Sequence, residues 1–224
     1  MSWGVLPPEP LGLAPAEHEG TRPVDAPFLG QPLAEFLGRV ASDEPAPGGG
    51  AVAAVTAAQA AGLVGMAARF SAAQLPDSAA RAARADDLRV QLADLAQRDA
   101  TAYGGVLAAL RLPREPEVKV RRQRIQSALE HAAAVPLAVA ELSAAVAREA
   151  VELSEGGNPN LRGDVLTAVF LAEAAARAAA ELVRINVEMG SLGDEMLVRA
   201  ARALDIAAQA SRRAGAMGPA GAAR

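Results

Sequence analysis

Apolar residues recur along most of this chain at the three- and four-residue spacing of an α-helix. Two stripes are especially regular: Leu88, Leu92, Leu95, Asp99, Tyr103, Val106 and Leu110, and then Asp164, Ala168, Leu171, Ala175, Ala178, Leu182 and Ile185. Apolar and polar residues do not alternate with the period of two that marks a β-strand. The pattern therefore predicts an all-α protein.

Clusters of proline and glycine divide this pattern into separate helices. We expect a bundle of five or six helices, two of them long. Residues 1–30 are rich in proline, glycine and acidic side chains, which is typical of a flexible N-terminal arm. Residues 31–213 are expected to form a single helical domain, and residues 214–224 a frayed tail.

The composition narrows the class of protein. The chain is 51% hydrophobic but only 3% aromatic, and much of its apolar content is alanine, which suits closely packed helices. A net charge of −4 with one Trp and one Tyr disfavours a nucleic-acid partner. With no cysteine and two distant histidines, the chain offers neither a disulfide framework nor a histidine-based metal site.

The apolar segment 51–70 is long enough to raise the question of a membrane span. It is mostly alanine, contains Thr56 and Gln59, and reaches Arg69 near its end. The N-terminus has no basic start followed by an apolar core, as a secretory signal would. We therefore expect a cytoplasmic protein without a membrane partner.

Asp99 lies in the middle of the first stripe, on a face that otherwise carries apolar and aromatic residues. Burying an isolated carboxylate is costly, so this side chain must be paired, hydrogen-bonded or open to a cleft. Such surroundings shift the pKa of a carboxyl group, which suits acid–base chemistry. A structural Asp that bonds the backbone or an arginine is the alternative at this point.

Residues 45–50 read Pro-Ala-Pro-Gly-Gly-Gly and run directly into the apolar segment. Proline disfavours helix before it, and bare glycines leave backbone N–H groups accessible at a helix N-terminus, which attracts anions. A tight, closely packed turn is an equally consistent interpretation. The loop has neither the Lys-Ser/Thr ending of a P-loop nor GxGxxG spacing, so a nucleotide site is not favoured.

Other polar positions also need an explanation. Asp164 heads the second stripe, where it either caps the helix or lines a site. Asn186 is polar among apolar neighbours and needs a partner. A basic cluster is typical of a solvated helix face and contains Lys119, Arg121, Arg122 and Arg124.

Several motifs follow one another in a characteristic order: Pro45–Gly50 before an alanine-rich helix, Asp99-Ala-Thr-Ala-Tyr103, Leu112-Pro-Arg114, Arg121, Ile125-Gln126-Ser-Ala-Leu129, Val135-Pro136-Leu137, Gly157-Asn158, Asp164 and Ile185-Asn186. In this order the chain resembles the cyclodeaminase/cyclohydrolase family. That family includes the C-terminal module of formiminotransferase-cyclodeaminase and free-standing bacterial methenyltetrahydrofolate cyclohydrolases. The likeness covers about residues 32–209.

The resemblance implies an all-helical homodimer, or higher homo-oligomer, that binds folate in a cleft near the subunit interface. It implies an enzyme that cyclises 5-formiminotetrahydrofolate to 5,10-methenyltetrahydrofolate with release of ammonia, or hydrolyses the methenyl form to 10-formyltetrahydrofolate. The tetrahydrofolate derivative is then the substrate, and neither a resident cofactor nor a metal is implied.

The resemblance also implies roles for individual residues. It places the catalytic carboxylate on Asp99, which would move a proton and stabilise the cationic methenyl carbon. It places substrate binding on Gly48, Gly49, Gly50, Tyr103, Arg121, Asp164 and Asn186. Asp164 and Asn186 would hold the pterin edge, and the three glycines would receive an anionic part of the ligand.

The chain departs from the family pattern at four places. Ala51 stands where many relatives have Ser, Gln97 where an acid is common, and Leu182 where Asn is usual. Residues 71–75, Ser-Ala-Ala-Gln-Leu, replace a stretch rich in Gly, Lys and Tyr. These departures support an alternative hypothesis: a helical dimer of the same fold that keeps a ligand pocket but no longer catalyses.

Overall fold

The computed structural model describes residues 27–113 and 118–216, and these residues form six α-helices, two short 3-10 helices and no β-strand. The helices are α1 (Leu33–Val40), α2 (Gly49–Arg69), α3 (Ser78–Leu110), α4 (Val118–Gly156), α5 (Arg162–Gly190) and α6 (Glu195–Ala216), with η1 (Phe28–Gly30) and η2 (Pro159–Leu161). The all-α prediction is confirmed. Most of the expected arm and tail, residues 1–26 and 217–224, lies outside the described residues.

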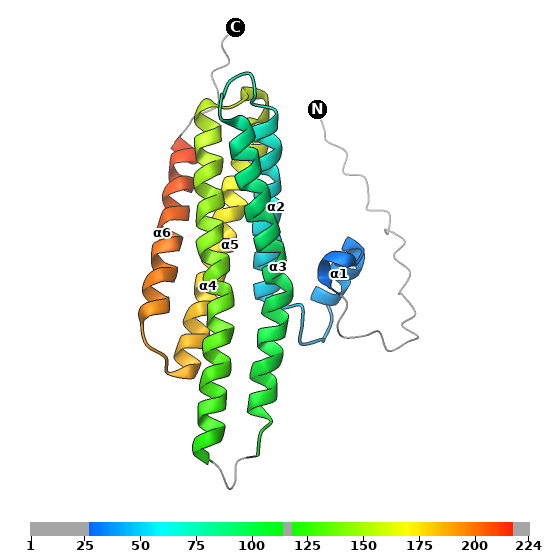
Figure 1. Ribbon diagram of the computed structural model, residues 1–224, viewed down its shortest axis with the longest axis vertical. Helices are drawn as coiled ribbons and strands as arrows, with labels where there is room; N and C mark the ends of the chain where they lie inside the picture. Colours follow the sequence, from blue (N-terminus) through cyan, green and yellow to red (C-terminus); the bar gives the residue numbers. More distant parts are fainter. Residues whose placement is uncertain (1–26, 114–117, 217–224) are drawn as a thin grey trace, which may run out of the picture.

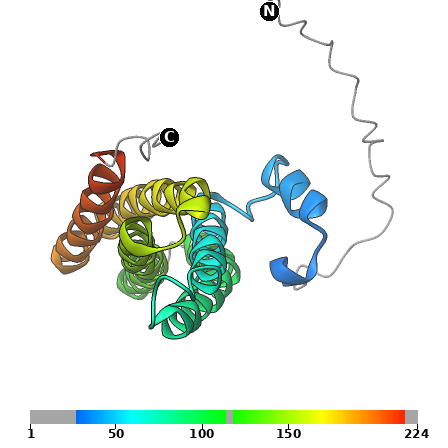
Figure 2. The same ribbon diagram turned by 90° about the horizontal axis from the view of Figure 1, so that it is seen from above.

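Helices α2, α3, α4 and α5 run alternately up and down to form a four-helix bundle (Figure 1). Helix α6 lies outside it and packs against α4 and α5, and α1 stands to one side (Figure 2). The core is built mainly from alanine and valine, which allow the helix axes to approach closely. Its largest fully buried apolar side chains include Leu92, Leu129, Val139, Val151 and Val169.

The regular stripe on α3 is buried along only part of its length. Leu92, Leu95 and Val106 are in the core, whereas Tyr103 and Leu110 are 45% and 42% exposed. The reason is that α3 and α4 continue beyond the N-terminal end of α2 (Figure 1). Past that point α3 has lost one of the neighbours that would cover its inner face.

On α5 the predicted face is displaced around the helix. Ala168 and Ala175 are buried as expected, but Ile185 is 39% exposed and the core also takes Val165, Val169, Ala172, Ala176, Ala179, Val183 and Val187. Helices α2, α4 and α6 all pack against α5. Contact on three sides buries a wider arc than one stripe, so spacing alone does not locate the centre of that arc.

The end of the bundle at which α2 finishes is closed by a hydrogen-bonded turn. The buried Ser71 hydroxyl donates to the Ala67 carbonyl at 2.7 Å and accepts from the Asn158 N–H at 2.9 Å. The Asn158 side chain donates to the Phe70 carbonyl at 3.0 Å. Gly157 is required here because a Cβ atom would approach the Leu153 carbonyl oxygen to 2.6 Å. These contacts fix the start of α5 beside the end of α2.

Helices α2 and α4 are long and apolar enough to cross a membrane by length and composition. In each, 61% of the most apolar window is buried inside the bundle, which is the behaviour of a core helix. The apolar segment that raised the question of a membrane span is therefore accounted for by packing.

The residues before α2 form a small N-terminal unit, defined here as residues 27–48. Pro27 caps η1, and η1 places Phe28 in the core, so these last residues of the expected flexible arm are ordered. The Phe28 and Phe36 rings pack edge to face with centroids 5.8 Å apart. Other apolar side chains of α1 are exposed: Leu33 is 62% and Leu37 is 56% accessible.

Candidate functional site

Asp99 on α3 faces the tip of α2, defined here as Gly48–Gly50. Helix α2 begins at Gly49 with Gly48 as its N-cap, so no side chain caps its first N–H groups. One of those groups, the N–H of Ala51, donates a hydrogen bond to the Asp99 carboxylate. The anion held by this helix end is therefore a side chain of the protein itself, and the positive end of the helix dipole favours it there.

The three glycines at the tip are not equivalent. A Cβ atom at Gly50 would overlap the carboxylate carbon and an oxygen of Asp99, whereas a Cβ at Gly48 or Gly49 would meet no heavy atom within 4 Å. Gly50 is thus needed for the close approach of α2 to Asp99. The space beside Gly48 and Gly49 is open and accessible to a ligand.

Burial raises the pKa of the half-buried Asp99 carboxyl above its ordinary value, and the hydrogen bond from the Ala51 N–H partly opposes this. No charged side chain contributes to the change. The pKa of this carboxyl is therefore set by its burial and by a backbone hydrogen bond, without an arginine partner. A carboxyl in such surroundings can exchange a proton closer to neutral pH than an exposed Asp can.

The N-terminal unit attaches to α3 beside this carboxyl. The side-chain oxygen of Gln97, two residues before Asp99, accepts from the Phe28 N–H at 3.1 Å. Within the unit, the Arg39 guanidinium lies 5.2 Å from the centre of the Phe28 ring and donates to the Ala46 carbonyl at 3.3 Å. Gln97, noted in the sequence only as a departure from the family pattern, therefore has a defined contact.

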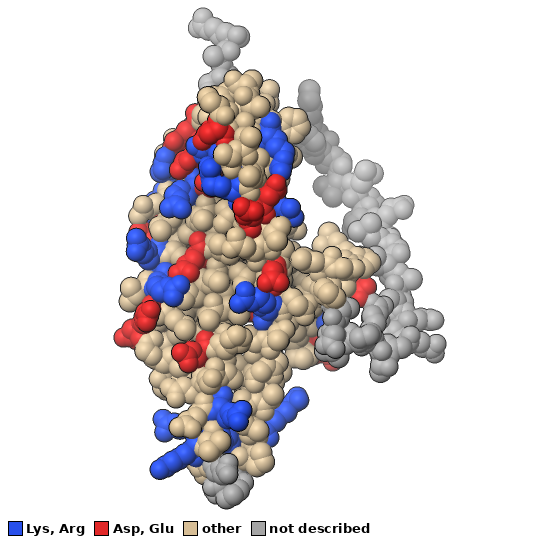
Figure 3. Space-filling model, viewed as in Figure 1, with Lys and Arg blue, Asp and Glu red and all other residues tan. Residues whose placement is uncertain are grey.

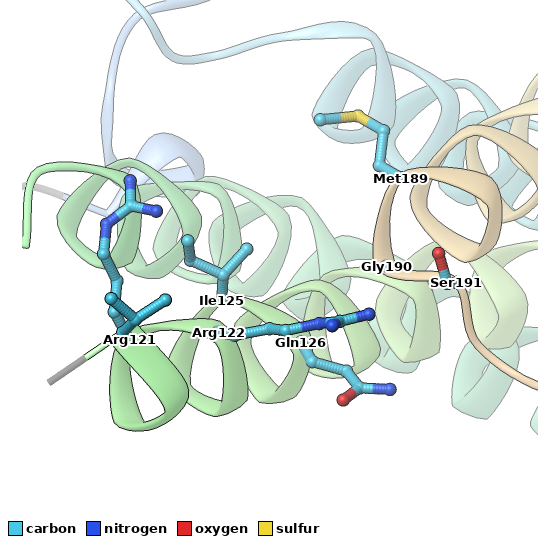
Figure 4. A pocket seen from close by; sticks show the side chains of 8 residues that line it. Arg121, Arg122, Ile125, Gln126, Met189, Gly190 and Ser191 are labelled. Atoms are coloured by element: carbon cyan, nitrogen blue, oxygen red, sulfur yellow. The ribbon is translucent and has the colours of Figure 1, made fainter. Parts of the chain in front are cut away.

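A cleft of about 540 Å³ lies at the same end of the bundle, between the first turns of α4 and the C-terminal end of α5. Figure 4 shows Arg121, Arg122, Ile125 and Gln126 on successive turns of α4, with Met189 of α5 across from them. Val118, Gly190 and Ser191 complete its lining, and Asp99 does not belong to it. The cleft combines cationic and apolar walls, so it suits an amphipathic anion.

The first turns of α4 carry cations that have no acidic partner in the described part of the chain. Lys119, Arg122 and Arg124 form no ion pair there. Arg121 is fixed by donating to the carbonyls of Leu110 and Leu112, both at 3.0 Å, at the end of α3. Figure 3 shows basic side chains gathered at this end of the molecule with no acidic ones among them.

Asn186 lies at about the level of Asp99 along the bundle. Helices α3 and α4 are antiparallel, and Arg121 of α4 contacts Leu110 of α3. Asp99 lies eleven residues before Leu110 and Ala132 eleven residues after Arg121, so Asp99 and Ala132 are at about the same height. The Asn186 amide donates to the carbonyls of Ala132 and Leu182, at 3.2 and 3.0 Å. Its N–H groups are therefore engaged with the helices, and its partner at residue 182 is a backbone atom.

Tyr103 and Asp164 lie in different places. Tyr103 is one helical turn beyond Asp99 on α3 and is 45% exposed. Asp164 is in the first turn of α5, beside the other end of α2. Since α2 has 21 residues, about 30 Å separates Asp164 from Asp99 in one protomer. The structure places Asp99 against the glycine tip and Asn186 at a similar height along the bundle. It places Asp164 far from all of them.

Sequence reasoning missed Arg39 and Phe28 as parts of this region, because Phe28 lies in the expected flexible arm and Arg39 in a segment with only a short helical pattern. It grouped Arg122 with a solvated face and gave no role to Met189. A metal centre finds no support in the described residues, which contain no group of three or more His, Cys, Asp or Glu side chains able to hold an ion.

Comparisons with known proteins agree on one family. The model of the family described as formiminotransferase-cyclodeaminase matches residues 32–204. Methenyltetrahydrofolate cyclohydrolase from Methylorubrum extorquens is 33% identical over 161 residues, which cover 68% of this chain and 77% of that protein. The crystal structure of formiminotetrahydrofolate cyclodeaminase from Thermotoga maritima is similar with a TM-score of 0.74 and 30% identity, covering 84% of this chain and 95% of that one.

A longer mammalian protein matches over one part of its length. Formimidoyltransferase-cyclodeaminase from Sus scrofa is 35% identical over 169 residues, which cover 72% of this chain. Those residues represent 31% of the Sus scrofa protein. This chain therefore corresponds to less than a third of that relative.

Proposed function

Because this chain belongs to the formiminotransferase-cyclodeaminase family, we propose that it is a folate-dependent one-carbon enzyme. It cyclises 5-formiminotetrahydrofolate to 5,10-methenyltetrahydrofolate with release of ammonia, hydrolyses 5,10-methenyltetrahydrofolate to 10-formyltetrahydrofolate, or catalyses both reactions. The tetrahydrofolate derivative is the substrate, and the proposal requires no resident cofactor.

The observation that supports this function most directly is the half-buried Asp99 carboxyl at an open helix tip. Both reactions pass through a cationic one-carbon unit between two nitrogens, and a carboxylate in a poorly hydrated site stabilises such a charge. The open space at Gly48 and Gly49 gives a planar ligand access to that carboxylate. Asp99 is the catalytic residue of the proposal.

In the cyclisation, N10 attacks the carbon of the protonated formimino group (N5–CH=NH2+) and loses its proton. The amino group formed in this way gains one proton and leaves as ammonia, and the positive charge remains on the methenyl unit. Asp99 accepts the first proton and donates the second, so the carboxyl ends in its starting state. In the hydrolysis, Asp99 takes a proton from the attacking water and returns it to N5 as the N5–carbon bond breaks. The remaining hydroxyl proton is released to solvent as the formyl C=O forms. Each role requires proton exchange, which the raised pKa of Asp99 assists.

The cleft at the start of α4 supports an orientation for the substrate. Folate ends in a glutamyl group whose carboxylates need cationic partners, and Arg121 and Arg122 line the cleft. Its apolar side chains Ile125 and Met189 suit the aromatic ring next to that group. Leu110, which contacts Arg121, is eleven residues from Asp99 on α3, so the cleft lies about 16 Å along the bundle from the carboxyl. An elongated ligand would span this distance.

A homodimer is part of the proposal. Exposed apolar side chains that support it gather on the N-terminal unit and at the free ends of α3 and α4: Leu29, Leu33, Leu37, Val40, Tyr103, Leu110, Leu112, Val118 and Val120. If Asp164 contacts a substrate at Asp99, it must do so from the second subunit, because about 30 Å separates the two within one protomer. Sedimentation analysis tests the dimer, and a monomer at assay concentration would refute it.

The alternative, an inactive dimer of the same fold, rests on the departures from the family pattern, and two of them leave useful contacts. Ala51 gives its backbone N–H to Asp99, so a Ser side chain is not needed for that bond. Gln97 supplies the acceptor for the Phe28 N–H. The changed stretch 71–75 lies at the opposite end of α2 from Asp99. These observations favour the enzyme, which we place in the cytoplasm.

The decisive experiment follows the absorbance of 5,10-methenyltetrahydrofolate and, in parallel, ammonia release from 5-formiminotetrahydrofolate. The wild-type chain is expected to turn over at least one of them, and Asp99→Asn neither. Asp94→Asn, an exposed Asp on the same helix, is the matched control and should retain activity. If the wild-type chain binds folate but turns over neither substrate, the inactive dimer is the correct description.

A further inference from the structure

At the tip of α2, only Gly50 is packed closely against another element. Gly48 caps the helix without a side-chain hydrogen bond, and added Cβ atoms at Gly48 and Gly49 would meet nothing within 4 Å. Only Gly50 is in close contact, and its partner is Asp99. The buried Ala51 ties the first turn of α2 into the bundle, and the approach of Gly48 and Gly49 to the carboxyl is set in addition by the residues that lead into them, Ala46 and the buried Pro47.

Arg39 connects this lead-in to the beginning of the N-terminal unit. Its guanidinium donates to the Ala46 carbonyl and to the Gln31 side chain, both at 3.3 Å, and lies 5.2 Å from the centre of the Phe28 ring. It also forms an ion pair with Glu44 at 3.0 Å. The Arg39 side chain is only 21% exposed, so water competes weakly for these contacts.

Gln97 connects the same unit to α3. Its side-chain oxygen accepts the Phe28 N–H at 3.1 Å, and its own carbonyl accepts from the Thr101 hydroxyl at 3.0 Å. Helix α1 stands clear of the bundle in both ribbon views (Figures 1 and 2), so η1 and the lead-in to α2 are where the unit is attached. A chain of contacts thus runs from Gln97 on α3 through the N-terminal unit to the glycine tip, which contacts Asp99 on the same helix.

We propose that Arg39 and Gln97 are positioning residues for Asp99. By holding the N-terminal unit between α3 and the lead-in to α2, they fix the glycine tip against the carboxylate and exclude water from it. Neither residue touches the reacting atoms. The inference deepens the proposed function and rests on it for its activity measurement, but not for its titration measurement.

The expected pH effect has a definite sign. Burial raises the pKa of Asp99, so a loosened tip that admits water lowers that pKa toward the ordinary value. Charged side chains do not set this pKa, although the surrounding elements carry several titratable or charged groups: Arg39, Glu44, Arg98, Tyr103, Glu130, His131, Arg184 and Glu188. Helix α2 has no charged residue before Arg69.

The test compares Arg39→Met and Gln97→Leu with Gln97→Glu. The first two remove the hydrogen bonds while keeping side-chain size. The third keeps an acceptor for the Phe28 N–H and adds a negative charge near Asp99. Arg98→Met, an exposed neighbour on α3 with a 3.9 Å ion pair, is the matched control. The measurements are the pH dependence of kcat and carbon-13 NMR titration of the Asp99 carboxyl, assigned with Asp99→Asn.

Arg39→Met and Gln97→Leu are expected to lower kcat about tenfold, because a small displacement of a catalytic group is costly. In both, the acid limb of the profile and the NMR titration of Asp99 move to lower pH. In Gln97→Glu both move to higher pH, because like charges disfavour ionisation. The control should match the wild type. A lower melting temperature without any change in either titration would mean a merely structural role and would overturn the inference.

The remaining outcomes are also informative. If Arg39→Met does not fold, Arg39→Lys keeps the charge but not the forked donors, and Gln97→Glu keeps the attachment. If the wild-type chain turns over neither folate but the NMR shifts occur as described, the positioning role stands and the proposed function fails. If turnover is normal and the Asp99 titration is unchanged in every variant, the positioning role fails and the proposed function stands.

Discussion

The two ends of α2 lie in very different surroundings. At its C-terminal end, the buried Ser71 hydroxyl and Asn158 satisfy one another and the nearby backbone. At its N-terminal end, the helix begins without a side-chain cap and directs its N–H groups at the half-buried Asp99. One end uses its polar groups for closure, whereas the other leaves a carboxyl and an open glycine surface available. Stability and chemistry are therefore concentrated at opposite ends of one helix.

The charged side chains at the two ends of the α3–α4 pair show a similar contrast. Beside the closed end, Arg81 and Arg84 both reach Glu149, and further acids surround them. At the open end, Lys119 and Arg122 have no acidic partner among the described residues, although the positive end of the α4 dipole makes cations unfavourable there. Cations left without an acidic partner at the open end indicate that an anionic ligand is expected to bind there.

The largest expected effect comes from the open end. Asp99→Asn should lower kcat about 10³-fold, within the usual contribution of general acid–base catalysis, while leaving the helical content unchanged. Steady-state assays on both folates, with circular dichroism, measure this. Activity within tenfold of the wild type would remove Asp99 from the mechanism and would make the two ends functionally alike.

A matched pair at the glycine tip sharpens the comparison. Gly50→Ala should lower kcat about 10- to 100-fold, because its Cβ overlaps the Asp99 carboxylate and displaces it. Gly49→Ala, one residue earlier with nothing within 4 Å, does not displace the carboxylate, so it should lower kcat less than Gly50→Ala and act mainly on KM, because its methyl group enters the space proposed for the ligand. Equal effects of the two substitutions on kcat would show that close approach to Asp99 is not the reason for the glycine.

The closed end should respond in stability and not in turnover. Ser71→Ala leaves the Asn158 N–H without its partner, which should lower the free energy of unfolding by about 1–3 kcal/mol. Thr167→Ala removes an exposed hydroxyl at the same end of the bundle and serves as the control. Chemical denaturation measures the difference. A loss of kcat in Ser71→Ala at a temperature where it is fully folded would contradict the division between the ends.

The smallest expected effect is a gain in the stability of Asp99→Asn over the wild type at neutral pH. Since the folded state raises the pKa of Asp99, ionising this carboxyl opposes folding, and stability is lost as the pH rises through that pKa. Asp99→Asn has no such loss. Its melting temperature should match the wild type in acid, where both side chains are neutral, and exceed it slightly at neutral pH. A variant that is less stable at neutral pH than in acid, relative to wild type, would contradict the raised pKa.

The residue pattern alone predicts the helical class, the number of helices and the isolation of Asp99 on an apolar stripe. Periodicity and proline–glycine breaks are local properties, so they can be read without knowing what packs against what. The order of the motifs is also a property of the sequence alone, and it already indicates the family that the comparisons show. Sequence spacing also singled out the glycine run, although it left open whether a ligand or the protein itself would occupy the helix tip.

The packing of the helices, and not the residue pattern, sets which of these residues meet. The close approach of Gly50 to Asp99 joins positions nearly fifty residues apart, and the hydrogen bond between Phe28 and Gln97 joins positions 69 residues apart. The packing also places Asp164 at the far end of α2, although Asp164 and Asp99 occupy similar stripes in the sequence. The physical reason is that a stripe states which side of a helix is apolar, whereas the length of the neighbouring helix decides how far that side is covered.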